Sequence, residues 1–466
     1  MNNTYKNLIE QTFDFPQEGF EVIDNELYFH DICLTDVIKQ YGTPLKLTYL
    51  PKIGSQINKA KRWFNVAMAK SNYKGKYTYC YCTKSSHFSF VLNEVLKHDT
   101  HLETSSAYDI EIINELNREG NLTKDTYIVC NGYKRPLYLE NIVKLIDEKF
   151  NVLPVLDNMK ELEYYKEHVN GKCNIGIRIA SEEEPSFEFY TSRLGIRYKD
   201  IKNFYLDQIK EDDRFDLKML HFFINTGIKD TSYYWSELVK CLQVYGELKK
   251  VCPELDSLNI GGGLPIKNSL GFEYDYEYMI EEIINQIKEF CVKHQIEEPN
   301  IFTEFGSFTV GESGASIYSI IDEKKQNDTE RWYMIDSSFI TTLPDIWGIN
   351  QKYIMMAINH WDIPYHRVNL GGLTCDSLDY YNSEAHENQV FLPKYSDDPK
   401  GTPLFIGFFN TGAYQEALSG FGGIKHCLIP SPKHVVIDRD AEGNITTRLF
   451  SKEQSHKSML KSLGYY

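Results

Sequence analysis

The chain has 466 residues, of which 42% are hydrophobic and 25% are charged, as in a globular protein large enough for two domains or for a barrel with an appendage. Its formal net charge of −16 and its lack of a basic stripe argue against a nucleic-acid partner, because phosphate neutralisation needs clustered Lys and Arg. No apolar signal segment and no run of about 18 apolar residues is present, so we expect a cytoplasmic protein without membrane contact.

Ten cysteines are scattered along the chain without a Cys-x-x-Cys pair. A chain of this size does not need disulfides to stabilise its core, so we expect free thiols in a reducing compartment. No Cys and His spacing typical of a zinc site occurs, and no metal is expected.

Apolar, β-branched runs of strand length recur through the first two-thirds of the chain. Segments between them carry apolar residues at helical spacing, for example the stripe from Met279 to Ile287. Eight strands that alternate with helices predict a (β/α)8 TIM barrel. The eight predicted strands are Tyr77–Lys84, His101–Ser105, Tyr127–Asn131, Val152–Asp157, Cys173–Ala180, Leu217–Asn225, Leu255–Gly263 and Asn300–Gly306.

Lys84 ends the first predicted strand, where alternation places it on one face with Thr78, Cys80 and Cys82. A lysine that is partly desolvated loses its proton easily and can form a Schiff base. Since the active sites of such barrels lie at the carboxyl ends of the strands, we expect the polar residues there to surround one site. Those residues are Lys84, Glu103–Ser106, Asn131–Gly132, Asp157–Asn158, Arg178, Asn225–Gly227, Gly261–Gly263 and Glu304–Gly306.

Beyond about residue 315 the pattern changes to short alternating runs separated by turns, such as His434–Asp438 and Ile445–Phe450. These runs predict a separate antiparallel β domain. The extended stretch Glu26–His30 near the N-terminus is expected to join it. The predicted division is therefore 1–45 as a segment of the β domain, 46–315 as the barrel and 316–466 as the C-terminal β domain.

Three motifs point to one cofactor. The glycine run Gly261-Gly262-Gly263 lets backbone N–H groups cradle an anion, and Glu304 at the eighth strand end needs a cationic partner. Cys375 stands beside Asp376, a proton donor beside a carboxylate that binds cationic groups. Pyridoxal 5'-phosphate needs a Schiff-base lysine, a phosphate cradle and an acid that keeps its ring nitrogen protonated, so these residues together predict a site for it.

The order of these motifs resembles the pyridoxal-phosphate decarboxylases of the alanine-racemase fold type, which act on ornithine, diaminopimelate and arginine. Within that group the string from Ser338 to Gln351, with its Pro-Asp-x-Trp-Gly-Ile core, and Thr374–Ser377 are most similar to biosynthetic arginine decarboxylases. The chain is shorter than the long bacterial members, so it looks like a compact form without their inserted helical region. The resemblance implies decarboxylation of L-arginine to agmatine and carbon dioxide, an early step of polyamine synthesis.

The resemblance also implies roles for single residues. Lys84, Glu304 and Cys375 would be catalytic, with Cys375 as the proton donor, and Asp345 and Asp376 would join it in binding a small cationic substrate. Cys375 and Asp376 would reach the barrel of a second subunit, which implies a homodimer with active sites at the subunit interface. The residues expected to hold the cofactor are Lys84, Phe223, Thr226, Gly261, Gly262, Gly263, Glu304, Gly306, Ser307 and Tyr414.

Two positions depart from the family pattern. Phe223 stands where the family has a histidine that stacks on the cofactor ring, and a phenyl ring can stack but cannot titrate. Ser307 stands where the family has a phosphate-binding arginine, so backbone donors and the hydroxyls of Ser307 and Thr226 would carry more of the phosphate binding.

Other readings stay open. The same chemistry could act on citrulline, ornithine, lysine or meso-diaminopimelate. A racemase would need a base on each face of the substrate, which the Cys375-Asp376 pair does not favour. A catalytically inactive regulator would be marked by loss of the lysine, and Lys84 is retained.

Overall fold

Eight parallel strands close into a barrel in the computed structural model of this chain, which describes residues 3–182, 188–385, 388–395 and 401–466. Neighbouring strands follow the order β10-β11-β12-β5-β6-β7-β8-β9, and every pair is parallel. The strands are β5 (Tyr77–Cys82), β6 (His101–Thr104), β7 (Ile128–Cys130), β8 (Val152–Leu156), β9 (Cys173–Arg178), β10 (Phe215–His221), β11 (Ser257–Asn259) and β12 (Asn300–Phe305). All eight predicted strands are present, although the predictions Leu217–Asn225 and Leu255–Gly263 run four residues past the ends of β10 and β11.

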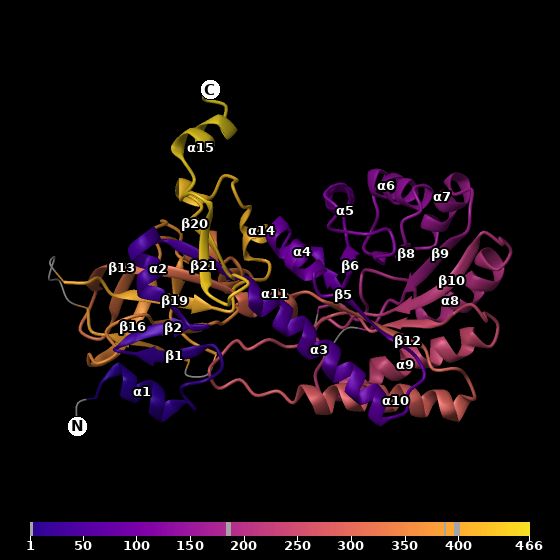
Figure 1. Ribbon diagram of the computed structural model, residues 1–466, viewed down its shortest axis with the longest axis horizontal. Coiled ribbons are helices and arrows are strands. Elements are labelled where there is room, and N and C mark those ends of the chain that lie inside the picture. Colours follow the sequence, from indigo (N-terminus) through magenta and orange to yellow (C-terminus); the bar gives the residue numbers. More distant parts are fainter. Residues whose placement is uncertain (1–2, 183–187, 386–387, 396–400) are drawn as a thin grey trace. The chain divides into compact units, whose positions relative to one another are not determined.

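Helices follow the barrel strands, and the two long helices α9 and α10 pack side by side outside the barrel (Figure 1). The helices are α3 (Leu50–Lys70), α4 (Ser89–Leu96), α5 (Ala107–Arg118), α6 (Pro136–Asp147), α7 (Lys160–His168), α8 (Tyr198–Phe204), α9 (Ser232–Lys249) and α10 (Tyr276–His294). Ser106 caps α5 as expected and completes a capping box with Asp109. Inside the barrel a small apolar cluster includes Cys80, Val129, Met219 and Phe302.

The internal contacts of the chain divide it into two units. One unit comprises Ile53–Pro265 and Tyr274–Thr309 and contains the barrel; the other comprises Met1–Lys52, Ile266–Glu273 and Val310–Tyr466 and is called the sheet unit below. The expected division fell at residues 45/46 and 315/316. The return of Ile266–Glu273 to the sheet unit, from within the barrel sequence, was not foreseen.

A ten-stranded sheet forms the sheet unit, with main path β17-β16-β14-β13-β4-β20-β21. Two of its pairs, β14 with β16 and β4 with β20, are parallel, so the sheet is mixed rather than purely antiparallel as expected. Its strands are β4 (Leu45–Tyr49), β13 (Gly314–Lys325), β14 (Arg331–Ile335), β15 (Ile354–Ala357), β16 (Tyr365–Gly371), β17 (Tyr380–Tyr381), β18 (Val390–Pro393), β19 (Phe405–Phe409), β20 (Lys433–Arg439) and β21 (Ile445–Ser451).

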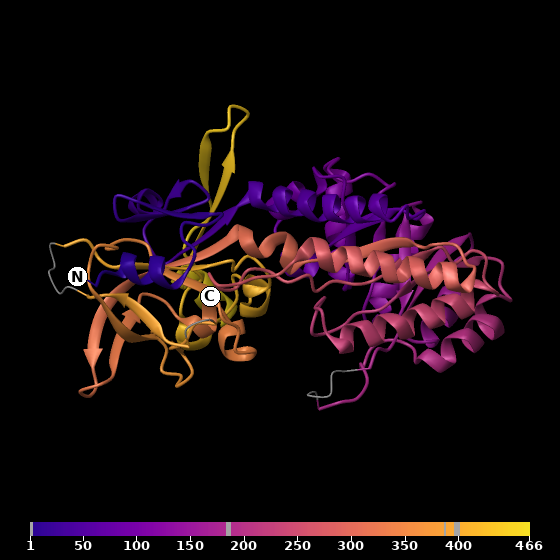
Figure 2. The same ribbon diagram turned by 90° about the horizontal axis from the view of Figure 1, so that it is seen from below.

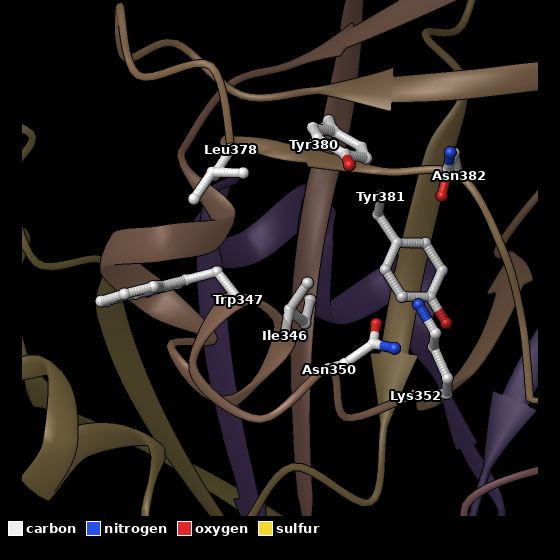
Figure 3. A pocket seen from close by; sticks show the side chains of 8 residues that line it. All are labelled: Ile346, Trp347, Asn350, Lys352, Leu378, Tyr380, Tyr381 and Asn382. Carbon is white, nitrogen blue, oxygen red and sulfur yellow. The ribbon is translucent and has the colours of Figure 1, made fainter.

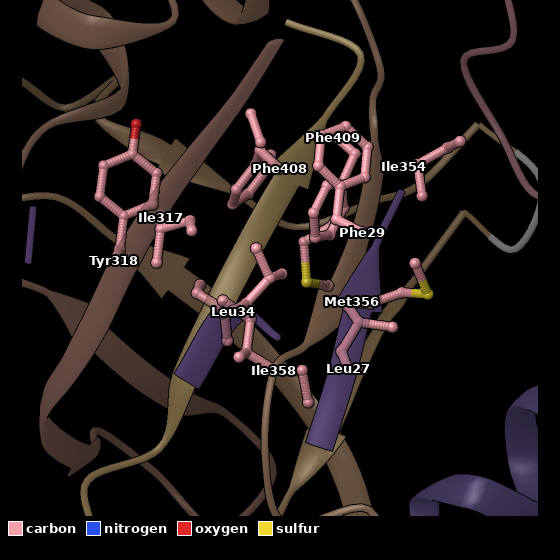
Figure 4. Close-up of a cluster of buried hydrophobic side chains, with 14 of the residues drawn as sticks. Leu27, Phe29, Leu34, Ile317, Tyr318, Ile354, Met356, Ile358, Phe408 and Phe409 are labelled. Atoms are coloured by element: carbon pink, nitrogen blue, oxygen red, sulfur yellow. The ribbon is translucent and has the colours of Figure 1, made fainter. Parts of the chain in front are cut away.

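The N-terminal elements add a small sheet and two helices to the same unit. Leu27 and Phe29 from β2 share one buried cluster with Phe408 and Phe409 from β19 (Figure 4). The N-terminal elements are α1 (Tyr5–Thr12), β1 (Phe20–Ile23), β2 (Glu26–Phe29), β3 (Ile32–Cys33) and α2 (Leu34–Tyr41). The view turned by 90° shows them in indigo beside the sheet (Figure 2).

The C-terminal part of the chain contains several short helices. They are α11 (Ser307–Val310), α12 (Phe339–Thr342), α13 (Asp345–Gly348), α14 (Gln415–Ser419) and α15 (His456–Ser462), with a 3-10 turn at His426–Leu428. Within the described residues, no helix has both the length and the apolar content to cross a bilayer.

Candidate active site

Lys84 was predicted to end a strand, from the alternation of side chains along Tyr77–Lys84, but it lies beyond the end of that strand. Strand β5 ends at Cys82, and Thr83–Ser85 form one 3-10 turn that carries the lysine. Nζ of Lys84 lies 2.6 Å from Oε2 of Glu103, which is 1% exposed at the end of β6, whereas the lysine side chain is 43% exposed. A turn, and not strand alternation, therefore presents this amine at the carboxyl end of the barrel.

Glu304, at the carboxyl end of β12, is surrounded by donors from three other strands. Asn131 Nδ2 donates to its Oε1 at 2.8 Å, Asn259 Nδ2 donates to the same oxygen at 2.6 Å, and His221 Nε2 lies 3.3 Å from Oε2. Burial acts to raise the pKa of Glu304, but His221 and the donors outweigh it and lower that pKa to about 2. The carboxylate is therefore ionised at neutral pH.

Asn131 joins the two buried carboxylates. Its Nδ2 also donates to Oε1 of Glu103 at 3.1 Å, so one amide touches both the partner of Lys84 and Glu304. Burial raises the pKa of Glu103; Lys84 opposes this rise and the charge of Glu304 adds to it. The lysine amine and the Glu304 carboxylate thus belong to one connected network of polar side chains.

Arg178 ends β9, and Phe223 comes two residues after the end of the neighbouring strand β10. The guanidinium of Arg178 lies 5.9 Å from the centre of the Phe223 ring, and its buried Nε has no hydrogen-bond partner among the residues that the structure describes. Phe223 is 37% exposed, and its carbonyl accepts a hydrogen bond from Ser181 Oγ at 2.9 Å. The backbone at Phe223 is therefore held while one aromatic surface stays accessible.

The glycine run packs so closely that side chains are excluded. A Cβ at Gly262 would overlap the carbonyl oxygen of Glu304, and one at Gly261 would press on the carbonyl of Phe222. The N–H of Gly261 donates to Asn259 Oδ1 at 2.9 Å, so Gly262 and Gly263 remain as the donors that we assign to the expected anion cradle. Thr226, half-buried, precedes Gly227, which packs against Gly263.

Gly306 supports the turn that bears the lysine. A Cβ at this position would overlap Oγ of Ser85, the residue after Lys84. Ser307, half-buried, follows at the start of α11. Any other residue at Gly306 would force the Ser85 side chain, next to Lys84, to move.

The donor set at the barrel end fits a pyridoxal group. It offers an amine for the aldehyde, an ionised carboxylate for a protonated ring nitrogen, an aromatic face, and an unpartnered buried Nε on Arg178 among the described residues. The role of each residue stays a prediction.

The remaining predicted site residues lie in the sheet unit. Asp345 begins α13, and its Oδ2 accepts a hydrogen bond from Gln415 Nε2 at 2.7 Å. Gln415 follows Tyr414, which caps α14 with a left-handed backbone and a φ of 68°. Burial raises the pKa of Asp345, and the bond from Gln415 opposes the rise.

Cys375 and Asp376 occupy the exposed loop between β16 and β17, and a buried carboxylate holds that loop in place. Asp379 accepts hydrogen bonds from the backbone N–H and the hydroxyl of Thr374, at 3.0 and 2.7 Å, and from the N–H of Phe339 at 2.8 Å. The loop is thereby tied to the start of helix α12.

A cavity of about 240 Å³ separates the α13 segment from the strand that follows the cysteine loop (Figure 3). Trp347 comes two residues after Asp345, and Leu378 comes two residues after Asp376. The cavity is lined by Ile346, Trp347, Asn350, Lys352, Leu378, Tyr380, Tyr381 and Asn382. The two segments that carry the predicted substrate carboxylates thus flank one hollow.

The sequence placed Glu103, Asn131 and Arg178 around the site without giving them roles, and it did not include His221 and Asn259. Those two lie in the middle of their predicted strands, whereas they end the shorter strands β10 and β11 of the structure. Asp379 was also missed, because the sequence does not show that Asp379 is buried while Asp376, in the same loop, is exposed.

A family model described as "Pyridoxal-dependent decarboxylase, pyridoxal binding domain" matches residues 55–311. A relative named biosynthetic arginine decarboxylase, from Prochlorococcus marinus, is 22% identical over 555 aligned positions, which cover 92% of this chain and 83% of the relative. The alignment is longer than this chain, so the relative contains segments that the chain lacks.

Solved structures share the architecture. The biosynthetic arginine decarboxylase of Campylobacter jejuni has a TM-score of 0.82 and 20% identity, and covers 99% of this chain and 90% of its own. Diaminopimelate decarboxylase from M. jannaschii in complex with L-lysine has a TM-score of 0.76 and 17% identity, and covers 95% of this chain and 97% of its own. The predicted barrel with an added β domain is confirmed.

Proposed function

Because the chain belongs to the pyridoxal-dependent decarboxylases of the ornithine, arginine and diaminopimelate group, we propose that it converts L-arginine to agmatine and carbon dioxide. The observation that carries the choice of arginine is that the segments that bear Asp345 and Asp376 flank one cavity. A planar guanidinium suits two-point binding by carboxylates better than an ammonium does. Agmatine would feed a polyamine route, and ten free thiols suit a reducing compartment such as the cytoplasm.

Each residue has a defined task in this proposal. Lys84 would hold the cofactor through its amine. Glu304 stays ionised and holds a proton on the cofactor ring nitrogen, as its pKa of about 2 allows. When bound, pyridoxal phosphate supplies the electron sink for the carbon–carbon bond that breaks.

The proton that replaces the carboxylate comes from Cys375. Its thiol donates to Cα after carbon dioxide leaves, and the thiolate regains a proton from solvent after the product leaves. Asp345 and Asp376 bind the cationic tail of the substrate, at the end opposite to the carboxylate that is lost.

A product assay over arginine, citrulline, ornithine, lysine and meso-diaminopimelate tests the proposal. We expect agmatine from arginine as the main product, and a kcat/KM for arginine that falls about 100-fold in Asp376→Asn, since a site that hydrogen-bonds a charged group loses that group's binding energy. Asp147→Asn, an exposed change on α6, is the control. Preferred turnover of neutral citrulline would contradict the carboxylate argument while leaving the cofactor chemistry intact.

The variant Lys84→Ala tests whether the chain is an active enzyme or a catalytically inactive regulator. We expect loss of turnover together with loss of the cofactor's visible absorption, and no change in Lys160→Ala, an exposed lysine on α7. Full activity of Lys84→Ala would reject the cofactor assignment.

We further propose a homodimer whose sites combine the barrel of one subunit with the cysteine loop of the other. Unfolded and refolded mixtures of Lys84→Ala and Cys375→Ala then regain about a quarter of wild-type activity, because half of the random dimers carry one intact site of two. If the mixed dimers recovered no activity, Lys84 and Cys375 of each site would belong to the same subunit.

A further inference from the structure

Three ligand-type side chains meet on the surface of the sheet unit. Cys375 lies in the loop after β16, and His426 and Cys427 lie in the 3-10 turn His426–Leu428. Sγ of Cys375 is 3.5 Å from Sγ of Cys427 and 4.0 Å from Nε2 of His426. All three ligand atoms lie within 4.8 Å of one another, and all three residues are exposed.

These separations are close to the edges of a zinc coordination tetrahedron. With zinc–sulfur bonds of about 2.3 Å and zinc–nitrogen bonds of about 2.0 Å, a tetrahedron has sulfur–sulfur edges of about 3.8 Å and sulfur–nitrogen edges of about 3.5 Å. The observed 3.5 and 4.0 Å differ from these by about half an ångström at most, which side-chain rotation can supply. Two sulfurs and an imidazole are also the donors that zinc prefers.

Both ligand-bearing segments are anchored to the same short helix. Asp379 ties the Cys375 loop to the N–H of Phe339 at the start of α12. Lys425, directly before His426, donates through Nζ to the carbonyl of Thr341 in α12 at 3.0 Å. A shared anchor fixes the distance between the two loops, so little conformational freedom is lost when a metal joins them.

We propose that Cys375, His426 and Cys427 form a binding site for a divalent zinc-like cation, with a fourth position open to water. Binding converts two thiols to thiolates and releases two protons to solvent, and the histidine binds as the neutral imidazole. The sequence spacing did not reveal this site, because Cys375 lies 51 residues before His426 and 52 before Cys427.

Occupation of this site has a regulatory consequence that rests on the proposed function. A metal-bound Cys375 thiolate carries no proton and cannot deliver one to the substrate. Zinc therefore inhibits decarboxylation through the proton donor, and metal binding itself does not depend on that role.

Cobalt substitution tests the site directly. Cofactor-loaded protein kept reduced with a non-chelating phosphine is freed of metal and titrated with Co²⁺. We expect one equivalent to give the intense visible d–d bands of tetrahedral coordination with thiolate ligands, and Zn²⁺ to abolish them by displacement. Weak octahedral bands, or a Cys375–Cys427 disulfide that persists under the reductant, would overturn the proposal.

Single variants assign the ligands. His426→Ala and Cys427→Ala are expected to weaken Co²⁺ and Zn²⁺ binding by at least about tenfold, because each removes a ligand. His456→Ala, an exposed histidine on α15 of the same unit, is the matched control. Unchanged affinity in both ligand variants would reject the site, and circular dichroism verifies that the variants are folded.

Inhibition separates this proposal from the enzymatic one. Zn²⁺ should inhibit the wild type at the concentration that fills the site, and Cys427→Ala should need at least about ten times more. Cobalt binding without inhibition would show that Cys375 is not the proton donor, and the proposed metal site would remain supported. Inhibition without cobalt bands would point to a different metal target and reject the site.

Discussion

Among single residues, Glu304 concentrates the most interactions at the barrel end. Two amides donate to one of its oxygens and His221 stands at the other, so its charge is stabilised before any ligand binds. This arrangement holds the pKa of the Glu304 carboxyl well below its usual value, so the carboxylate is ionised at neutral pH. We therefore expect a loss of activity on mild acidification to arise from other groups.

Glu304→Gln is expected to lower kcat by about 100-fold or more, since a neutral amide cannot hold a proton on the cofactor ring nitrogen. Steady-state rates together with the cofactor absorption spectrum measure this change. Glu115→Gln, on the exposed side of α5, is the control. Wild-type kcat in Glu304→Gln would mean that the cofactor nitrogen does not face this carboxylate.

Phe223→His tests the departure from the family pattern. A histidine keeps an aromatic face and adds a hydrogen-bonding nitrogen, so we expect cofactor binding tighter by up to about tenfold. Phe223→Leu, which removes the aromatic face, should weaken it. Fluorescence titration of cofactor-free protein measures both affinities, and equal affinities for all three proteins would exclude stacking at this position.

At the scale of elements, the cysteine loop and helix α12 act as one piece. Asp379 receives three strong hydrogen bonds from the two segments, and it is 5% exposed. The position of Cys375 therefore depends on a carboxylate four residues away that does not touch the substrate.

Asp379→Asn should lower the free energy of unfolding by about 1.5 to 3 kcal/mol, because hydrogen bonds to a buried charge are lost or weakened. It should also reduce kcat for every accepted substrate, whereas Asp376→Asn should alter substrate preference at unchanged stability. Chemical denaturation and the substrate panel distinguish the two variants. A change of preference in Asp379→Asn without loss of stability would contradict a purely positioning role.

Much of the barrel could be predicted from sequence, because each strand is an apolar run that ends in a polar or glycine-rich turn. The network around Glu304 could not, since Asn131, His221 and Asn259 come together only when the sheet closes. The 3-10 turn at Lys84 was missed because alternation continues past the true strand end. The approach of Cys375 to Cys427 depends on long-range packing against α12, which no local pattern records.

On the scale of the whole molecule, three histidines among the described residues of the sheet unit have a disfavoured positive charge. Burial, with nearby Lys or Arg, lowers the pKa of His30, His366 and His434 to about 4, from an ordinary value of 6.5. The unfolded chain binds more protons than the folded chain between these values, so stability is lost as the pH falls from 6.5 toward 4.

His434→Gln should reduce this acid sensitivity, because the fully buried His434 no longer has to gain a proton on unfolding. The difference between stabilities at pH 7 and pH 4 is expected to shrink by at most about 3 kcal/mol. Urea unfolding at a series of pH values measures it, with the exposed His456→Gln as the control. An unchanged pH profile in His434→Gln would assign the acid sensitivity to other groups.

Strand β4 is synthesised long before the two strands that it pairs with in the sheet. It lies between β13 and β20 in the sheet, yet it leaves the ribosome at residues 45–49, long before either neighbour. At about 5 to 20 residues per second, roughly 15 to 50 seconds pass before β13 is made. The barrel, whose strands are consecutive, is completed during that interval, while β4 waits with both edges open to other chains. Holdase chaperones that cover these edges are therefore expected to raise the yield of folded protein, and slow translation, which lengthens the interval, to lower it.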